Sequence, residues 1–150
     1  MTGTHGIADE HRPIAALLVG TWVAMDEDTG SELAVTIHRC DEHGMAPVVA
    51  SIVKVGWIIA GTAIDDRDLQ QTMAAVRAVR PNIRVAVLGD PTDWRRCEMW
   101  FRKGCQVYLD VKSSVERVAA AIKHSSLHDV AIADRTFQRL QEVRRSAGVP

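Results

Sequence analysis

The stretch GWIIAGTAIDD (residues 56–66) decides the fold class. Its apolar run, Trp57 to Ala60, is too short for a surface helix, but it suits a strand buried on both faces of a parallel sheet. Gly61 ends the run, and polar turn residues follow. In open α/β sheets, ligands and chemistry lie beyond the carboxyl ends of the strands. The residues from Gly61 onward are therefore expected to carry the function, although glycine has no side chain for chemistry.

The composition is that of one soluble domain. The chain has 150 residues, of which 47% are hydrophobic, and its net charge of −1 provides no basic excess that would favour nucleic acid. The 3 cysteines form no CxxC pair, no apolar run approaches the roughly 20 residues of a membrane helix, and the start does not resemble a signal peptide. We therefore expect a cytoplasmic protein with reduced thiols that does not enter a membrane.

Strand and helix patterns alternate along the chain. Strands are predicted at residues 2–8, 33–38, 56–60, 83–88 and 106–109, and helices at 13–25, 47–53, 69–79, 94–103, 115–122 and 131–145. The helix pattern at residues 115–122 has Ser113 or Ser114 as its cap, and residues 124–128 are expected to break it. This alternation predicts an α/β fold, with a doubly wound five-stranded parallel sheet over residues 1–125 and an extra C-terminal helix in residues 126–150.

Several short passages in this order resemble one family. IADEH (residues 7–11) resembles a first strand followed by an acidic pair, and RKGCQVYL (residues 102–109) resembles the R-A-G-A-x-G-Y-L passage of response-regulator receiver domains. Over about residues 2–125 the chain is similar to the CheY-like receivers of NarL/LuxR-type transcription regulators. Residues 126–150 then resemble the linker helix that leads to a DNA-binding domain in such proteins.

The resemblance implies a degenerate phosphorylation pocket. In receivers an acidic pair holds Mg²⁺, a strand-end aspartate takes the phosphoryl group, and a Ser or Thr and a Lys complete the site. The acidic pair falls on Asp9 and Glu10, the acceptor on Gly61, the Ser/Thr position on Gly89 and the Lys position on Val111. The pair is either a residual cation or ligand site or, as we favour, an acidic helix start stabilised by the helix dipole. Without the nucleophile, aspartyl phosphorylation is not expected.

No neighbouring residue replaces the missing groups. Lys112 is one residue beyond the lysine position, and a shift of one residue along a strand points a side chain to the other face. Asp65 and Asp66 lie in the loop after the acceptor position, not at the strand end. The chain is therefore predicted to be a pseudo-receiver.

The fourth helix is apolar on more than one face. Trp94, Cys97, Trp100 and Phe101 exceed the single stripe that a helix on a sheet needs. They indicate either a dimer interface, as the resemblance implies for this helix, or a deeper core. Tyr108 matches the family's switch aromatic; without phosphorylation we expect a packed, static tyrosine.

Metal and catalytic sites are not predicted. The loop from His38 to His43 contains metal-ligand residue types, including Cys40, but no second segment supplies further ligands, so a solvated loop is favoured. No nucleophile–base arrangement is evident, so neither enzymatic activity nor a cofactor is expected.

The predicted function is that of a phosphorylation-independent regulatory domain of a transcriptional regulator. It would signal through homodimerisation and the C-terminal helix, and it would reach DNA only through an output domain absent from this chain. The alternative is a small-molecule sensor in which a metabolite binds where Gly61 and Gly89 leave space. An enzyme of another flavodoxin-like family is disfavoured, because glycines stand where catalytic groups would be.

Overall fold

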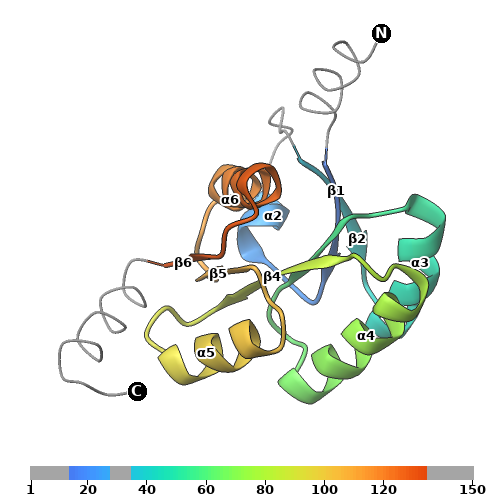
Figure 1. The fold of residues 1–150 in the computed structure, drawn as a ribbon, viewed down its shortest axis with the longest axis horizontal. Coiled ribbons are helices and arrows are strands. Elements are labelled where there is room, and N and C mark those ends of the chain that lie inside the picture. The colour runs from blue at the N-terminus through green and yellow to red at the C-terminus, as the bar shows by residue number, and fades with distance from the viewer. Residues whose placement is uncertain (1–13, 28–34, 135–150) are drawn as a thin grey trace, which may run out of the picture.

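The computed structural model describes residues 14–27 and 35–134, and in them six parallel strands form one sheet (Figure 1). The strand order is β2-β1-β3-β4-β5-β6. The elements are β1 (Ile14–Val19), α2 (Val23–Glu27), β2 (Val35–Cys40), the 3₁₀ helix η1 (His43–Met45), α3 (Ala46–Val53), β3 (Trp57–Ala60), α4 (Asp66–Val79), β4 (Arg84–Gly89), α5 (Trp94–Arg102), β5 (Val107–Asp110), α6 (Val115–His128) and β6 (Ile132–Ala133). The predicted α/β fold of the flavodoxin/CheY-like kind is confirmed, with one strand more than expected.

Helices cover both faces of the sheet. In Figure 1, α3, α4 and α5 lie on one side, and α2 and α6 lie on the other. Because side chains alternate along a strand, Ile58 of β3 packs on the side of α3, α4 and α5, whereas Trp57 and Ile59 pack on the side of α2 and α6. All three side chains are at most 2% exposed, as expected for a strand covered on both faces. No helix among residues 14–27 and 35–134 is long and apolar enough to cross a membrane.

The first strand of the described residues lies where a helix was predicted. The helix predicted from Pro13 to Met25 is wrong, because Ile14–Val19 forms β1 between β2 and β3, with Ala16 beside Trp57. A continuous apolar run satisfies both helical and strand spacing, and here the sheet on either side determines the outcome. The predicted strand at residues 2–8 lies outside the described residues, as do Asp9 and Glu10. The acidic pair therefore precedes β1 in the chain and does not follow it.

The C-terminal part also differs from the prediction. The break expected at residues 124–128 is wrong, because α6 continues to His128 and ends at Asp129, whose left-handed backbone (φ 52°) closes the helix. The boundary at residues 125/126 therefore falls inside α6. Ile132 and Ala133, expected to begin a helix, instead pair with β5. The remainder of the predicted last helix lies outside the described residues.

The helices α4, α5 and α6 each begin at a side-chain cap. Asp65, rather than the predicted Asp68, caps α4, and its carboxylate accepts a hydrogen bond from the Asp68 N–H at 2.8 Å. Asp93 caps α5, and Ser114, one of the two predicted residues, caps α6. Each cap satisfies a backbone donor that the first helical turn leaves unpaired. All three caps lie at the edge of the sheet where the strands end.

Candidate functional site at the carboxyl edge of the sheet

The carboxyl ends of β3, β4 and β5 surround one open pocket of about 660 Å³. Gly61, Gly89 and Val111, which the sequence placed in a degenerate phosphorylation pocket, all line it. The structure therefore brings these three positions together, as expected for neighbouring parallel strands. Asp9 and Glu10, the other predicted members of the site, lie outside the described residues. The charged side chains of the lining come from Asp90, Arg96, Asp110 and Lys112.

Gly61 is enclosed by backbone. The loops after β1 and β3 form an antiparallel bridge, in which the N–H groups of Thr21 and Thr62 each donate to the other residue's carbonyl, at 2.8 and 2.7 Å. A Cβ atom at position 61 would lie 2.2 Å from the Thr21 carbonyl oxygen. At Gly20, where φ is +84°, a Cβ atom would lie 2.3 Å from the Thr62 carbonyl oxygen. Both positions therefore require glycine because two backbones approach closely.

The space at Gly89 is filled by side chains. A Cβ atom there would lie 2.4 Å from the Tyr108 hydroxyl oxygen and 2.4 Å from Nη1 of Arg96. Tyr108 is 1% exposed, which agrees with the expected packed tyrosine. Two strand ends that looked vacant in the sequence are thus occupied, one by the Thr21 backbone and one by Arg96 and Tyr108.

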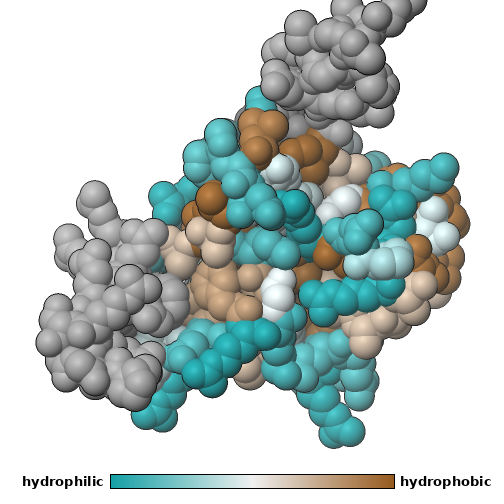
Figure 2. Space-filling model, in the orientation of Figure 1, coloured by the Kyte–Doolittle hydropathy of each residue, from teal (hydrophilic) through white to brown (hydrophobic). Residues whose placement is uncertain are grey.

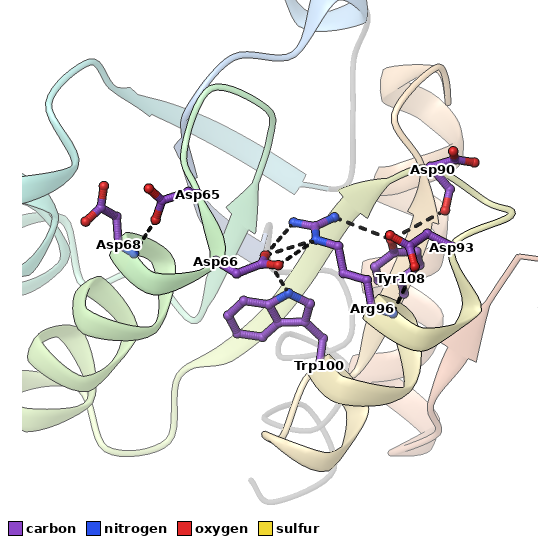
Figure 3. A network of polar contacts seen from close by, with 8 residues as sticks. All are labelled: Asp65, Asp66, Asp68, Asp90, Asp93, Arg96, Trp100 and Tyr108. Atoms are coloured by element: carbon purple, nitrogen blue, oxygen red, sulfur yellow. Dashed lines mark hydrogen bonds and ion pairs between the residues drawn. The ribbon is translucent and has the colours of Figure 1, made fainter.

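An ion pair joins the start of α4 to α5. Nη2 of Arg96 lies 2.9 Å from Oδ1 of Asp66, and Nε of Arg96 donates to the same carboxylate at 3.0 Å (Figure 3). The indole N–H of Trp100 donates to Asp66 at 3.1 Å. Asp66 is therefore approached by three donor nitrogens, which belong to two side chains one turn apart on α5. The sequence pattern places Asp66 only in a loop and does not indicate this network.

The same arginine also reaches the end of the sheet. Nη1 of Arg96 donates to the Tyr108 hydroxyl at 3.4 Å, and that hydroxyl donates to the Asp90 carbonyl oxygen at 3.4 Å. Burial raises the pKa of Tyr108 above its ordinary value, although Arg96 opposes the shift. The pKa of Arg96 is also raised, because its contacts with Tyr108 and Asp66 outweigh the opposing effect of burial. At neutral pH Arg96 is therefore a cation and Tyr108 a neutral phenol.

The remaining carboxylates of the pocket are engaged in turns. Asp90 accepts hydrogen bonds from the backbone N–H and the hydroxyl of Thr92, at 2.8 and 2.7 Å, and these bonds lower the pKa of Asp90. Asp110 accepts from the Lys112 N–H at 2.9 Å. Asp90 directly follows β4 and Asp110 ends β5, and the sequence pattern indicates little or no role for either at the site. In the described part of the chain, no group of three side chains could hold a metal ion.

Two of the four interface candidates on α5 belong to the core. Cys97 is 1% exposed and Trp100 is 3% exposed, and both pack against the sheet. Their prediction as interface residues is corrected by this burial. Trp94 and Phe101 are half-buried and pack against the same core. The deeper-core alternative therefore accounts for the inner side of α5.

The histidine-rich loop is divided between a strand and a surface turn. His38 lies within β2, whereas Asp41, Glu42 and His43 are exposed. Cys40 ends the strand, is 5% exposed, and its thiol donates to the Glu42 carbonyl oxygen at 3.0 Å. Burial raises the pKa of this thiol. The residues do not converge on a common point.

Comparison of the sequence with protein-family models and with curated proteins gives no match. The structure alone therefore defines the class of this protein. It is a doubly wound α/β domain of the flavodoxin/CheY-like kind, and its own backbone partly closes the carboxyl edge of the sheet.

Proposed function

We propose that this chain is a phosphorylation-independent regulatory domain on a receiver-like scaffold. It acts by associating with itself and by passing its state, through the residues after β6, to a DNA-binding output domain of a transcription regulator. The observation that carries the proposal is the contact at Gly61, where any side chain would meet the Thr21 carbonyl oxygen at 2.2 Å. The strand end where a receiver carries its phosphoacceptor has neither a carboxylate nor room for one.

Neighbouring carboxylates do not supply a substitute nucleophile. Asp65 is held as the cap of α4 by its hydrogen bond from Asp68. Asp66 is bound by Arg96 and Trp100 and is turned toward α5 (Figure 3). An attacking carboxylate must be free to approach phosphorus in line with the leaving oxygen. These two aspartates are committed to structural contacts, which supports a domain without aspartyl chemistry.

A fixed network supports regulation by association rather than by a phosphorylation switch. Arg96 connects Asp66 on α4 with Tyr108 on β5, and it also fills the space at Gly89. In switchable domains an added phosphate creates new charge-assisted contacts that reposition a bistable element. In this protein the positions that such contacts would use are already occupied by the arginine and the tyrosine.

The first experiment tests phosphorylation directly. The purified protein is incubated with acetyl phosphate and Mg²⁺, and its intact mass is measured over time. We expect no stoichiometric phosphoryl adduct. A stable adduct on the folded protein that Asp65→Asn or Asp66→Asn abolishes would overturn the proposal, because it would show that a neighbouring carboxylate does replace the missing acceptor.

The second experiment tests the regulatory role. The chain is fused to a DNA-binding domain that occupies its operator only as a dimer, and repression of a reporter is measured. We expect repression that does not depend on a phosphoryl donor. A soluble, folded fusion that fails to repress would contradict action through self-association.

A second candidate function is effector sensing. The pocket at the carboxyl edge carries both signs of charge, from Asp90, Asp110, Arg96 and Lys112, which suits a small polar metabolite with charged groups of both signs. Ligand at about 100 times its dissociation constant would stabilise the protein by about 2.7 kcal/mol. For a domain of this size, that corresponds to a rise in melting temperature of about 5–11 °C. A metabolite screen by thermal shift that leaves the melting temperature unmoved would remove this candidate.

A further inference from the structure

Exposed apolar side chains gather over α3 and α4. Met45, Val48, Ile52 and Val79 are 48%, 48%, 74% and 47% exposed, and they are four of the seven large apolar side chains that are exposed in the described ranges. Figure 2 shows brown atoms along the right-hand edge of the molecule, over α3. The outer side of α4 adds the exposed small residues Ala74, Ala75 and Ala78. We call this surface the α3–α4 face.

Within the α3–α4 face, α3 lacks the charged cover of an ordinary surface helix, whereas α4 also exposes Gln71 beside its alanines. The sequence of α3, APVVASIV, contains no charged residue. By contrast, the exposed positions of α6 include Glu116, Arg117 and His124. A helix on the surface of a monomer normally presents charged and polar residues to water. An apolar outer side such as that of α3 is typical of a helix that another protein surface covers.

Charges at the two ends of the face have opposite signs. The exposed carboxylates Asp41, Glu42 and Asp65 precede the N-terminal ends of α3 and α4, where Arg67 is also exposed. Lys54, Arg77 and Arg80 lie at the C-terminal ends. The two helices pack against each other and run in the same direction, because each connects parallel strands. The middle of the face is therefore uncharged and mostly apolar, and its two ends are acidic and basic.

We propose that the α3–α4 face binds a second copy of this chain as a two-fold symmetric dimer. Only one pairing satisfies the charges. If the two-fold axis lay along the helices, α3 would meet α4 of the second copy in parallel, and acidic ends would face acidic ends. If the axis crosses the helices, α3 packs antiparallel on α3 and α4 on α4, so that each acidic end meets a basic end. The face is thus complementary to itself.

This inference rests on the self-association in the proposed function and names the surface that performs it. The surface differs from α5, whose apolar residues Cys97 and Trp100 are buried within the monomer. A partner of a different sequence would need an apolar strip with the same charge polarity, whereas a second copy has it already. Dimerisation would join the two sheets through the helices that lie on one side of each.

The test is sedimentation velocity from roughly 1 μM to 1 mM, the range over which weak specific interfaces dissociate. We compare the wild type with Ile52→Lys and with the control Leu127→Lys on α6, where the leucine is 52% exposed. Both replaced side chains are largely in solvent, so both variants should fold, which melting curves verify. We expect a wild-type dimer and an increase in dissociation constant of about 100-fold or more for Ile52→Lys, since the substitution occurs twice in a symmetric interface. Leu127→Lys should leave the constant unchanged.

A charge exchange tests the antiparallel arrangement. Lys54→Glu and Glu42→Lys should each weaken dimerisation when measured alone, because two like-charge contacts then form. An equimolar mixture of the two variants should recover a heterodimer, in which both end contacts pair opposite charges again. Failure of the mixture to recover would overturn the antiparallel pairing.

The remaining outcomes separate the two proposals. A wild-type dimer that Ile52→Lys leaves intact, or that Leu127→Lys dissociates, overturns the α3–α4 face but leaves self-association standing. A wild type that is monomeric at the highest concentration overturns both the face and self-association. A phosphoryl adduct would overturn phosphorylation independence without affecting the sedimentation result.

Discussion

Adding one methyl group at Gly61 should destabilise the whole edge of the sheet. In Gly61→Ala the new Cβ would lie 2.2 Å from the carbonyl oxygen and 2.8 Å from the carbonyl carbon of Thr21. These are backbone atoms, so the clash cannot be relieved by a side-chain rotation. The loop after β1 must move away, and this movement separates the paired N–H and C=O groups of Thr21 and Thr62.

The expected cost follows from two contributions. Overpacking of a filled site costs about 1–3 kcal/mol, and loss of a backbone hydrogen bond costs about 1 kcal/mol net. With the two Thr21–Thr62 bonds of 2.8 and 2.7 Å disrupted, the free energy of unfolding should fall by about 3–5 kcal/mol. In a domain of this size the melting temperature should fall by about 6–20 °C.

Urea denaturation followed by tryptophan fluorescence measures this change, with Gly56→Ala as the matched control. Gly56 lies at the opposite end of β3, and a Cβ atom there would have no neighbour within 4 Å. The control should therefore be neutral or slightly stabilising, by up to about 1 kcal/mol. If Gly61→Ala were as stable as Gly56→Ala, the close approach of Thr21 would not constrain this position, and the argument against a phosphoacceptor would fail.

Three further predictions concern the network and the buried thiols. Asp66→Ala removes the acceptor of Arg96 and Trp100 (Figure 3), so it should lower the free energy of unfolding by about 1–3 kcal/mol in urea titrations. The control Gln71→Ala, on the same helix, should not lower it. Equal stabilities of the two variants would argue against the network. Burial raises the pKa values of Cys97 and Cys105 from 9.0 to about 12, so both thiols should resist a thiol reagent at pH 8 until denaturant is added, and rapid labelling of the native protein would contradict their burial. Because these pKa values are higher in the folded state, the thiols' contribution to stability should be intact below pH 9 and be lost as the pH rises toward 12. Urea titrations at several pH values measure this loss, and the free energy of unfolding should fall less steeply with pH in Cys97→Ala.

Four of the predicted strands are present as β2, β3, β4 and β5, and two of these have a β-branched apolar run that ends at a glycine. Trp57–Ala60 before Gly61 and Arg84–Leu88 before Gly89 have this form, and both are strands. The run Ile14–Val19 before Gly20 has it as well, but its alanines and leucines favour helices and its continuous apolar character fits helical spacing. The glycine that ends the Ile14–Val19 run, as at the ends of β3 and β4, is the feature of the sequence that indicates a strand there.

The candidate site could be predicted only in part, because its determining contacts are not local. The pattern indicated that Gly61 and Gly89 lack reactive side chains, and the structure places both on one pocket. The sequence contains no sign that Thr21, far along the chain, comes within 2.2 Å of a Cβ at position 61. Nor does it indicate that Asp66 pairs with Arg96, since ion pairs between distant segments depend on how the helices pack.

The bridge between Thr21 and Thr62 also has an evolutionary consequence. Glycine and aspartate codons can differ by a single nucleotide, so one point mutation could replace Gly61 by a residue with a carboxylate. In the folded protein an aspartate at this position would also require the β1–α2 loop to rearrange, because the Thr21 carbonyl occupies the place of the first side-chain atom. A carboxylate at this strand end therefore requires coordinated changes in two loops, and point mutation alone does not provide them.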